Sequence, residues 1–192
     1  MDGIRSFIAI EVPQPLLARI EELQRELKRM EADVKWVRPE GIHLTLKFLG
    51  SIHAQDLEKL ARAIGPIVAA WNPFELRIHG LGCFPSSRSP RVIWAGIDRG
   101  DGEASSLQKV IEDKAADFGF APEARPFKPH LTLGRVRTPR GRNSLIQVME
   151  NYKDVEIGTF LAREVFLFKS ELQPSGAVYT KLHTFPMGKN QI

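Results

Sequence analysis

The sequence predicts an α+β fold with a mainly antiparallel sheet, and three observations support this class. Segments with helical and strand patterns are interspersed without the regular alternation of a parallel α/β protein. No glycine-rich turn joins a strand to a helix, as it does in a doubly wound nucleotide-binding fold. The 192 residues are 43% hydrophobic and 26% charged, which is enough apolar content to bury a core. We expect one domain, or one domain with an internal duplication.

Nine segments have the composition of β-strands, rich in Ile, Val, Phe and Thr and bounded by Gly, Pro or short polar runs. In chain order they cover residues 4–12, 34–37, 42–49, 74–79, 91–97, 130–136, 155–161, 164–170 and 177–185. Residues 80–90 contain turn-forming residues and are expected to form a loop. Trp94 lies in an apolar strand and is expected to pack in the core.

Four segments have apolar residues at three- and four-residue spacing, the pattern of a helix with one buried face. In chain order they cover residues 16–31, 55–70, 103–118 and 144–151. Pro13 and Pro15 mark the start of the first, because proline is tolerated in the first helical turn. Gly65 and Pro66 are expected to kink or shorten the second, and Gly119 is placed to end the third.

Cysteine usage and hydropathy narrow the class of protein. Cys83 is the only cysteine, so no disulfide can form within the chain and a zinc site built from several cysteines is excluded. The first ten residues lack the apolar region and cleavage site of a secretory signal. No stretch approaches the roughly 18 to 20 apolar residues of a membrane span. The sequence predicts a cytoplasmic protein with no membrane contact.

The net charge of +4 is mild, but basic residues cluster locally. The stretch from residue 125 to 142 holds six of them and no acidic residue; they are Arg125, Lys128, Arg135, Arg137, Arg140 and Arg142. Such a stretch favours a polyanionic partner such as nucleic acid. A solvated basic loop without a partner is the alternative.

The same four residues, His-Leu-Thr-Leu, occur twice in predicted strands, at 43–46 and 130–133. Because side chains alternate along a strand, the histidine and the threonine of each copy share one face. The residues on these faces are His43 and Thr45 in the first copy and His130 and Thr132 in the second. A single histidine on a strand is most often structural. A duplicated fold, however, would bring both strands together about a pseudo-twofold axis, and both polar faces would meet in one cleft.

Two histidines and two threonines in one cleft suit phosphodiester chemistry without a metal. One imidazole can remove a proton from an attacking oxygen while a second, protonated one donates a proton to the leaving oxygen. The threonine hydroxyls can donate hydrogen bonds to phosphate oxygens that gain charge in the transition state. A zinc site is a weaker interpretation, because no third ligand lies at a recognisable spacing.

Over essentially its whole length the chain resembles the two-histidine phosphoesterase superfamily, and within it the RNA 2′,3′-cyclic phosphodiesterases, also called 2′-5′ RNA ligases. The resemblance rests on both motif copies with their flanks, HLTLKFLG and RPFKPHLTLGR, and on three further segments. These further segments are residues 5–10, 82–85 and 90–94. The resemblance implies one bilobal domain over residues 1–192 with an internal pseudo-twofold repeat. Its two mainly antiparallel sheets would face a central groove, with helices on the outside.

The resemblance also implies an enzyme that hydrolyses a terminal RNA 2′,3′-cyclic phosphate to a 2′-phosphomonoester, with no metal or other cofactor. His43 would be the general acid that protonates the leaving O3′, and His130 the general base that activates water. The sequence alone leaves these two labels exchangeable. Thr45, Thr132 and Arg135 are the implied phosphate contacts. Some relatives also join tRNA halves through a 2′,5′ linkage, so RNA with such ends is the expected partner.

Strand alternation beyond each motif predicts where the next side chains point. Lys47 is expected on the face of His43, and Phe48 on the opposite face, packed in the core. Arg135 follows Leu131 and Leu133 at two-residue spacing. An uninterrupted strand would therefore point it to the same face as these leucines, away from the cleft. Either a bulge near Gly134 reverses this orientation, or Arg135 is a structural surface residue. The glycine favours the bulge.

Further RNA contacts are expected from residues next to the two motifs. Phe84 and Phe127 are candidates for stacking on bases, with packing in the core as an equal alternative. Arg125 and Lys128 are candidates for contacts with the RNA backbone.

The sequence is compatible with two other functions. The same site could act on a small substrate, either a cyclic nucleotide or ADP-ribose cyclic phosphate. The chain could also be an RNA-binding module without turnover, although both motifs are intact. A monomer is the default expectation for its oligomeric state.

Overall fold

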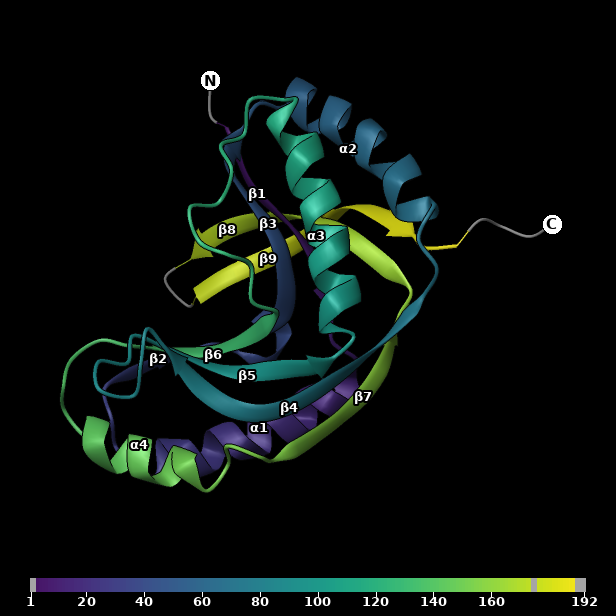
Figure 1. Ribbon diagram of the computed structural model, residues 1–192. Helices are drawn as coiled ribbons and strands as arrows, with labels where there is room; N and C mark the ends of the chain where they lie inside the picture. The colour runs from purple at the N-terminus through teal and green to yellow at the C-terminus, as the bar shows by residue number, and fades with distance from the viewer. Residues whose placement is uncertain (1–2, 174–175, 189–192) are drawn as a thin grey trace.

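A computed structural model describes residues 3–173 and 176–188, and within them nine strands form one curled sheet (Figure 1). The strand order is β7-β4-β5-β6-β3-β1-β8-β9, with β2 paired to β6. The strands are β1 Ile4–Glu11, β2 Val34–Trp36, β3 His43–Ile52, β4 Phe74–Phe84, β5 Val92–Arg99, β6 His130–Val136, β7 Glu156–Ala162, β8 Glu164–Gln173 and β9 Gly176–Pro186. All pairings found between these strands are antiparallel, which confirms the predicted class.

The two sheets implied by the resemblance are joined into one. β7, β4, β5 and β6 form one half, and β3, β1, β8 and β9 form the other. The halves meet where β3 pairs with β6, and the two strands share a single register pair, Leu44 with Leu131. Because these leucines lie inside the two His-Leu-Thr-Leu motifs, the seam between the halves brings the motifs side by side.

Helices cover the outside of each half (Figure 1). They are α1 Gln14–Lys28, α2 Ala54–Ala69, α3 Asp101–Ala116 and α4 Arg142–Glu150; a single 3-10 turn, η1 Pro39–Gly41, precedes β3. α2 and α3 pack against each other and against β9 and β3, whereas α1 packs along β7 and α4 along β4. Fully buried aliphatic side chains such as Ile20, Leu60 and Ile111 fill the space between these helices and the sheet. None of the helices described is long and apolar enough to cross a membrane.

One expected shortening and one predicted boundary are wrong. Helix α2 covers Ala54–Ala69, which agrees with the predicted residues 55–70, so Gly65 and Pro66 do not shorten it. Pro66 removes only its own N–H donor, and the rest of the helix continues around it. Strand β4 extends through Gly82 to Phe84, in a stretch that the sequence predicts as a loop. The ring of Trp94 on β5 covers Gly82 so closely that a Cβ atom there would lie 2.3 Å from it. This glycine therefore makes room for the ring of Trp94. Ile93 and Ala95 face the core, and Trp94 lies partly buried outside it, so the prediction that Trp94 packs in the core is wrong.

Both motif strands carry a β-bulge at the last residue of the motif. In β3, Thr45 pairs with Ala9 but Lys47 pairs with Ile8, so one extra residue is inserted. The insertion reverses the alternation of side chains. Lys47 is consequently buried, and Phe48 is 57% exposed. The predicted orientations of these two residues are therefore wrong.

The second bulge lies at the equivalent place in β6. Thr132 pairs with Trp94 and Gly134 with Ile93, so Leu133 is the extra residue. The bulge that the sequence favours near Gly134 is present, and Arg135 is exposed rather than packed with the leucines.

Candidate active site

The seam between the two halves forms a pocket of about 370 Å³. We call it the motif pocket; its lining includes Arg5, His43, Thr45, Phe48, Thr132 and Arg135. The structure thus brings together four of the five residues predicted at the reaction centre. The fifth, His130, does not line this pocket as it stands. It lies two residues before Thr132 on β6 and pairs with Gly96 of β5.

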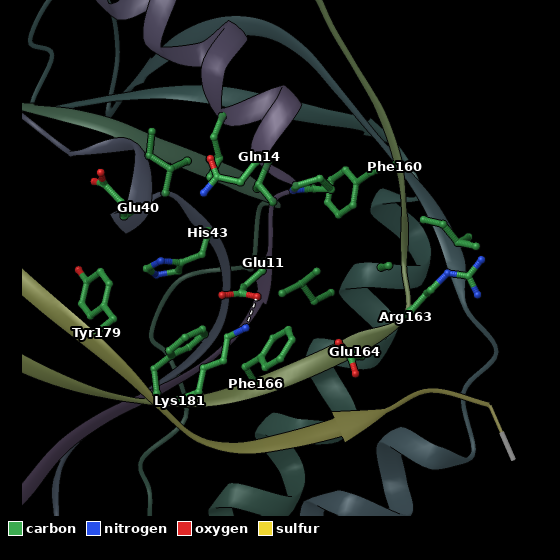
Figure 2. Close-up of a pocket in the computed structure, with 18 residues that line it drawn as sticks. Glu11, Gln14, Glu40, His43, Phe160, Arg163, Glu164, Phe166, Tyr179 and Lys181 are labelled. Atoms are coloured by element: carbon green, nitrogen blue, oxygen red, sulfur yellow. Dashed lines mark ion pairs between the residues drawn. The ribbon is translucent and has the colours of Figure 1, made fainter. Parts of the chain in front are cut away.

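His43 lies in a group of aromatic rings. Its ring stacks on Phe7, with centroids 4.6 Å apart and planes at 21°, and the ring of Tyr179 approaches edge-on at 5.4 Å. Figure 2 shows Tyr179 beside it. Burial lowers the pKa of His43 to about 4, and a hydrogen bond with the backbone of Gly41 offsets only part of this effect. The imidazole of the free protein is therefore neutral at neutral pH.

His130 is held by the backbone instead. Its Nδ1 lies 2.6 Å from the carbonyl oxygen of Lys128, and because a carbonyl can only accept, Nδ1 carries the proton. Nε2 of the neutral ring is then free to accept a proton. Burial lowers the pKa of His130, the Lys128 carbonyl opposes this, and the charge of Arg135 lowers the pKa further. Phe84 meets the ring edge-on, with centroids 5.0 Å apart.

The two bulges place different side chains in the motif pocket. Arg135 and Phe48 each follow a motif histidine by five residues, and both line the pocket. The sequence analysis assigns Phe48 to the core and so misses it. Its equivalence to Arg135 is the signal that could have revealed it, because the same reversal of alternation applies to both strands.

The predicted RNA contacts lie outside the motif pocket. Phe84 packs between His130 and Trp94, and Phe127 packs partly buried against the hydrophobic core. Arg125 and the side chain of Lys128 are exposed in the segment that precedes β6. Of the six basic residues between 125 and 142, Arg135 alone is among the described residues lining this pocket.

Arg5 and Tyr179 are pocket residues to which the sequence analysis assigns no role, although Arg5 lies in the segment 5–10 that contributes to the family resemblance. Strand β1 carries Arg5 and strand β9 carries Tyr179, and both strands belong to the half that contains β3. Burial raises the pKa of Tyr179, whereas the nearby charges of Arg5 and Arg135 lower it. Among the described residues that line the motif pocket, none is Asp or Glu. The pocket therefore favours an anion.

Two buried polar side chains support the bulges. Lys47 donates to Oε1 of Glu112 on α3 and to the carbonyl oxygen of Ala121, both at 2.8 Å. Gln24 of α1 donates from Nε2 to the carbonyl oxygens of Val37, at 2.8 Å, and Leu133, at 2.9 Å. An ion pair thus fixes the first bulge, and a neutral amide fixes the second.

A second pocket, of about 500 Å³, lies on another side of His43 (Figure 2). It shares His43 and Tyr179 with the motif pocket, but its lining carries three carboxylates, those of Glu11, Glu40 and Glu164. Glu11 forms an ion pair with Lys181 at 2.6 Å, drawn as a dashed line in Figure 2. Within the part of the chain that the structure describes, no cluster of His, Cys, Asp and Glu is arranged to hold a metal ion.

Comparison with known proteins finds matches over nearly the whole chain. The family model described as LigT like Phosphoesterase matches residues 10–94 and 97–179, and each segment contains one motif copy. The RNA 2′,3′-cyclic phosphodiesterase of Methanothermobacter thermautotrophicus is 36% identical over 182 residues, which cover 95% of this chain and 98% of that protein.

Solved structures show the same arrangement of elements. The crystal structure of a Thermus thermophilus protein matches with a TM-score of 0.79 and 28% identity, covering 97% of this chain and 100% of that one. E. coli LigT complexed with 3′-AMP matches with a TM-score of 0.78 and 26% identity, covering 96% and 98%. Sequence and fold thus point to the same group of proteins.

Proposed function

The chain belongs to the LigT-like phosphoesterase family, and from this membership we propose that it hydrolyses the 2′,3′-cyclic phosphate at the end of an RNA to a 2′-phosphomonoester. One observation carries the proposal. The seam between β3 and β6 gathers His43, both motif threonines and Arg135 in one anion-favouring pocket, with His130 two residues away from Thr132 on the same strand. The relative from Methanothermobacter bears the name of this activity.

The tautomer of His130 supports its role as the general base. With Nδ1–H donated to the Lys128 carbonyl, Nε2 can take the proton from a water molecule whose oxygen attacks phosphorus. The bond from phosphorus to O3′ then breaks, and O3′ takes a proton from His43. Thr45, Thr132 and Arg135 would donate hydrogen bonds to the non-bridging oxygens, where negative charge is held in the transition state.

His43 must gain a proton before it can act as the acid. Burial keeps its pKa near 4 in the free protein. A bound phosphate anion favours the charged imidazole, because an opposite charge within a few ångströms raises the pKa of a histidine. We therefore propose that substrate binding and protonation of His43 occur together.

An RNA end, including that of a tRNA half, is the substrate we propose. The exposed ring of Phe48 is placed to stack on a base, and base stacking tolerates any sequence. E. coli LigT has been crystallised with a mononucleotide, 3′-AMP. The same groups would join RNA ends through a 2′,5′ linkage if a ribose hydroxyl replaced water. We propose a monomer built as an internal duplication, since each half of the sheet supplies one copy of the motif.

A time course on a short RNA with a 2′,3′-cyclic phosphate end tests the proposal. The wild type, in excess chelator, should convert the end to a 2′-phosphate. The rate should fall about 10²- to 10⁴-fold in each of His43→Ala and His130→Ala, which is the usual contribution of a positioned acid or base. The exposed His53, replaced in the same way, serves as the matched control.

Near wild-type turnover by either motif variant would overturn the mechanism. Turnover of a small cyclic nucleotide in preference to RNA would point to the alternative substrate. Binding of RNA without conversion would point to a binding module.

A further inference from the structure

The motif pocket contains one arginine that the proposed hydrolysis does not use, Arg5. A cyclic phosphodiester carries a single negative charge, and both motif threonines lie with Arg135 at the seam to receive it. Arg5 lines the same pocket from strand β1. Within residues 3–173 and 176–188, neither Arg5 nor Arg135 forms an ion pair. Both guanidinium groups are thus available to an anionic ligand.

The pairing of β1 with β3 gives the order of the contacts along the pocket. Thr45 lies opposite Ala9, and Phe48 lies opposite Phe7. Arg5 lies opposite Ser51, four residues along β1 from Ala9. Since a strand rises about 3.3 Å per residue, the backbone of Arg5 is about 13 Å along the strand from the level of Thr45. The exposed ring of Phe48 lies between these two levels.

This order matches the chemical order of a nucleotide. A nucleotide at the 3′ end of an RNA carries its cyclic phosphate on one side of the ribose and the 5′-phosphate on the other, with the base attached between them. With the cyclic phosphate at the motif threonines and the base on Phe48, the 5′-phosphate extends toward Arg5. Arginine suits this contact, because its planar guanidinium binds two phosphate oxygens at once.

We propose that Arg5 binds the 5′-phosphate of the terminal nucleotide. The pocket then distinguishes a nucleotide that continues into a chain from a nucleoside that carries only the cyclic phosphate. The inference rests on the proposed function for the direction in which the nucleotide lies. It assigns recognition of the second phosphate to Arg5 rather than to the basic stretch of residues 125–142.

Calorimetric binding of two adenosine compounds that differ only in the 5′-phosphate tests the inference without catalysis. The compounds are adenosine 2′-phosphate and adenosine 2′,5′-bisphosphate. The wild type should bind the bisphosphate about 10- to 100-fold more tightly, the range for hydrogen bonds to a charged group. Arg5→Gln should reduce this preference to near unity, and Arg5→Lys should keep part of it because the charge remains.

Arg62→Gln, at an exposed arginine of helix α2, is the matched control and should keep the full preference. Equal affinity of the wild type for both compounds, or a preference that survives Arg5→Gln, would overturn the inference. The thermal midpoint of each variant shows that it is folded.

A rate measurement separates this inference from the proposed function. Adenosine 2′,3′-cyclic phosphate and its 5′-phosphorylated form are compared as substrates. Hydrolysis of both at equal kcat/KM by the wild type would overturn the role of Arg5 and leave the proposed function standing. Hydrolysis of neither, with the binding preference intact, would overturn the proposed function and leave Arg5 as a phosphate contact.

Discussion

The two motif strands have the same four residues and the same bulge, yet their surroundings differ. His43 on β3 stacks on a phenylalanine in an aromatic group, whereas His130 on β6 is fixed by a backbone carbonyl. Five residues after each histidine, β3 presents Phe48 and β6 presents Arg135. The repeated sequence thus places the two histidines and the two threonines at the same positions on the two strands. The surroundings assign an apolar contact to one strand and a charged contact to the other.

The supports beneath the two bulges also differ, and their loss should have the largest effect on stability. Glu112→Ala leaves the ammonium group of Lys47 buried without its partner, and an unpaired buried charge costs about 3–5 kcal/mol. Chemical denaturation should show this fall in the free energy of unfolding. The double variant Lys47→Met, Glu112→Leu should recover most of it, because a buried ion pair is often replaced by apolar residues without loss.

Gln24→Leu is the matched change at the second bulge. It should cost only about 1 kcal/mol, because the carbonyl of Leu133 keeps a hydrogen bond from the backbone N–H of Val37. A loss as large as that of Glu112→Ala would show that the two bulges depend equally on their side-chain supports.

Arg135→Ala should have the next largest effect, on catalysis rather than on folding. Removing one group that stabilises charge in a transition state typically costs 10²- to 10³-fold in kcat, that is about 3–4 kcal/mol. Steady-state kinetics on the cyclic phosphate should show the loss in kcat more than in KM. Arg137→Ala removes a neighbouring exposed cation and is the control. An equal loss of kcat in both variants would mean that the arginines after the β6 motif act only through their overall positive charge and not through a specific contact with the phosphate.

The protonation of His43 makes a third difference that pH can measure. The folded state holds its pKa at about 4, whereas an unfolded chain has about 6.5, so the unfolded chain binds the proton first as the pH falls. This contribution to stability is complete above pH 6.5 and is lost as the pH falls toward 4. A shift of this size corresponds to about 3 kcal/mol.

Unfolding by urea at several pH values should therefore show that the free energy of unfolding falls more steeply toward acid pH in the wild type than in His43→Gln. His53→Gln should leave the wild-type slope unchanged. Identical slopes in the wild type and His43→Gln would show that burial does not shift this pKa.

The elements and the motif residues could be predicted from the sequence because their signals are local. Alternation and helical spacing locate the strands and helices, and the repeated His-Leu-Thr-Leu locates four residues of the candidate site. The bulges could be predicted only where a glycine marked one. Gly134 indicated a bulge that reverses the orientation of Arg135. No glycine lies beside Leu46 and Lys47 to indicate the bulge in β3. The reversal at Phe48 depends on how β3 pairs with β1, which is information about a neighbouring strand.

Residues that reach the site from other elements were beyond sequence reasoning for the same reason. Arg5 lies in a segment of the family resemblance that gives it no role, and Tyr179 lies in none. Both enter the pocket because β1 and β9 lie in the same half as β3. Gln24 is 109 positions away from Leu133, the residue that it supports. Only the tertiary packing of α1 against the sheet brings these two together.

The smallest expected effect on activity concerns Phe48, the residue whose orientation the bulge reverses. Phe48→Ala should raise KM for a nucleotide substrate about 10-fold or more, since stacking on an aromatic ring contributes about 1–3 kcal/mol per base. The value of kcat should change less, because the ring lies away from the reacting phosphate. Phe48→Trp keeps a stacking surface and is the matched variant. Stability should hold in both, since the side chain is 57% exposed and little apolar contact is lost. If KM does not change in Phe48→Ala, the base binds elsewhere. In that case only the bulge of β6 directs a side chain to the substrate, and the bulge of β3 does not.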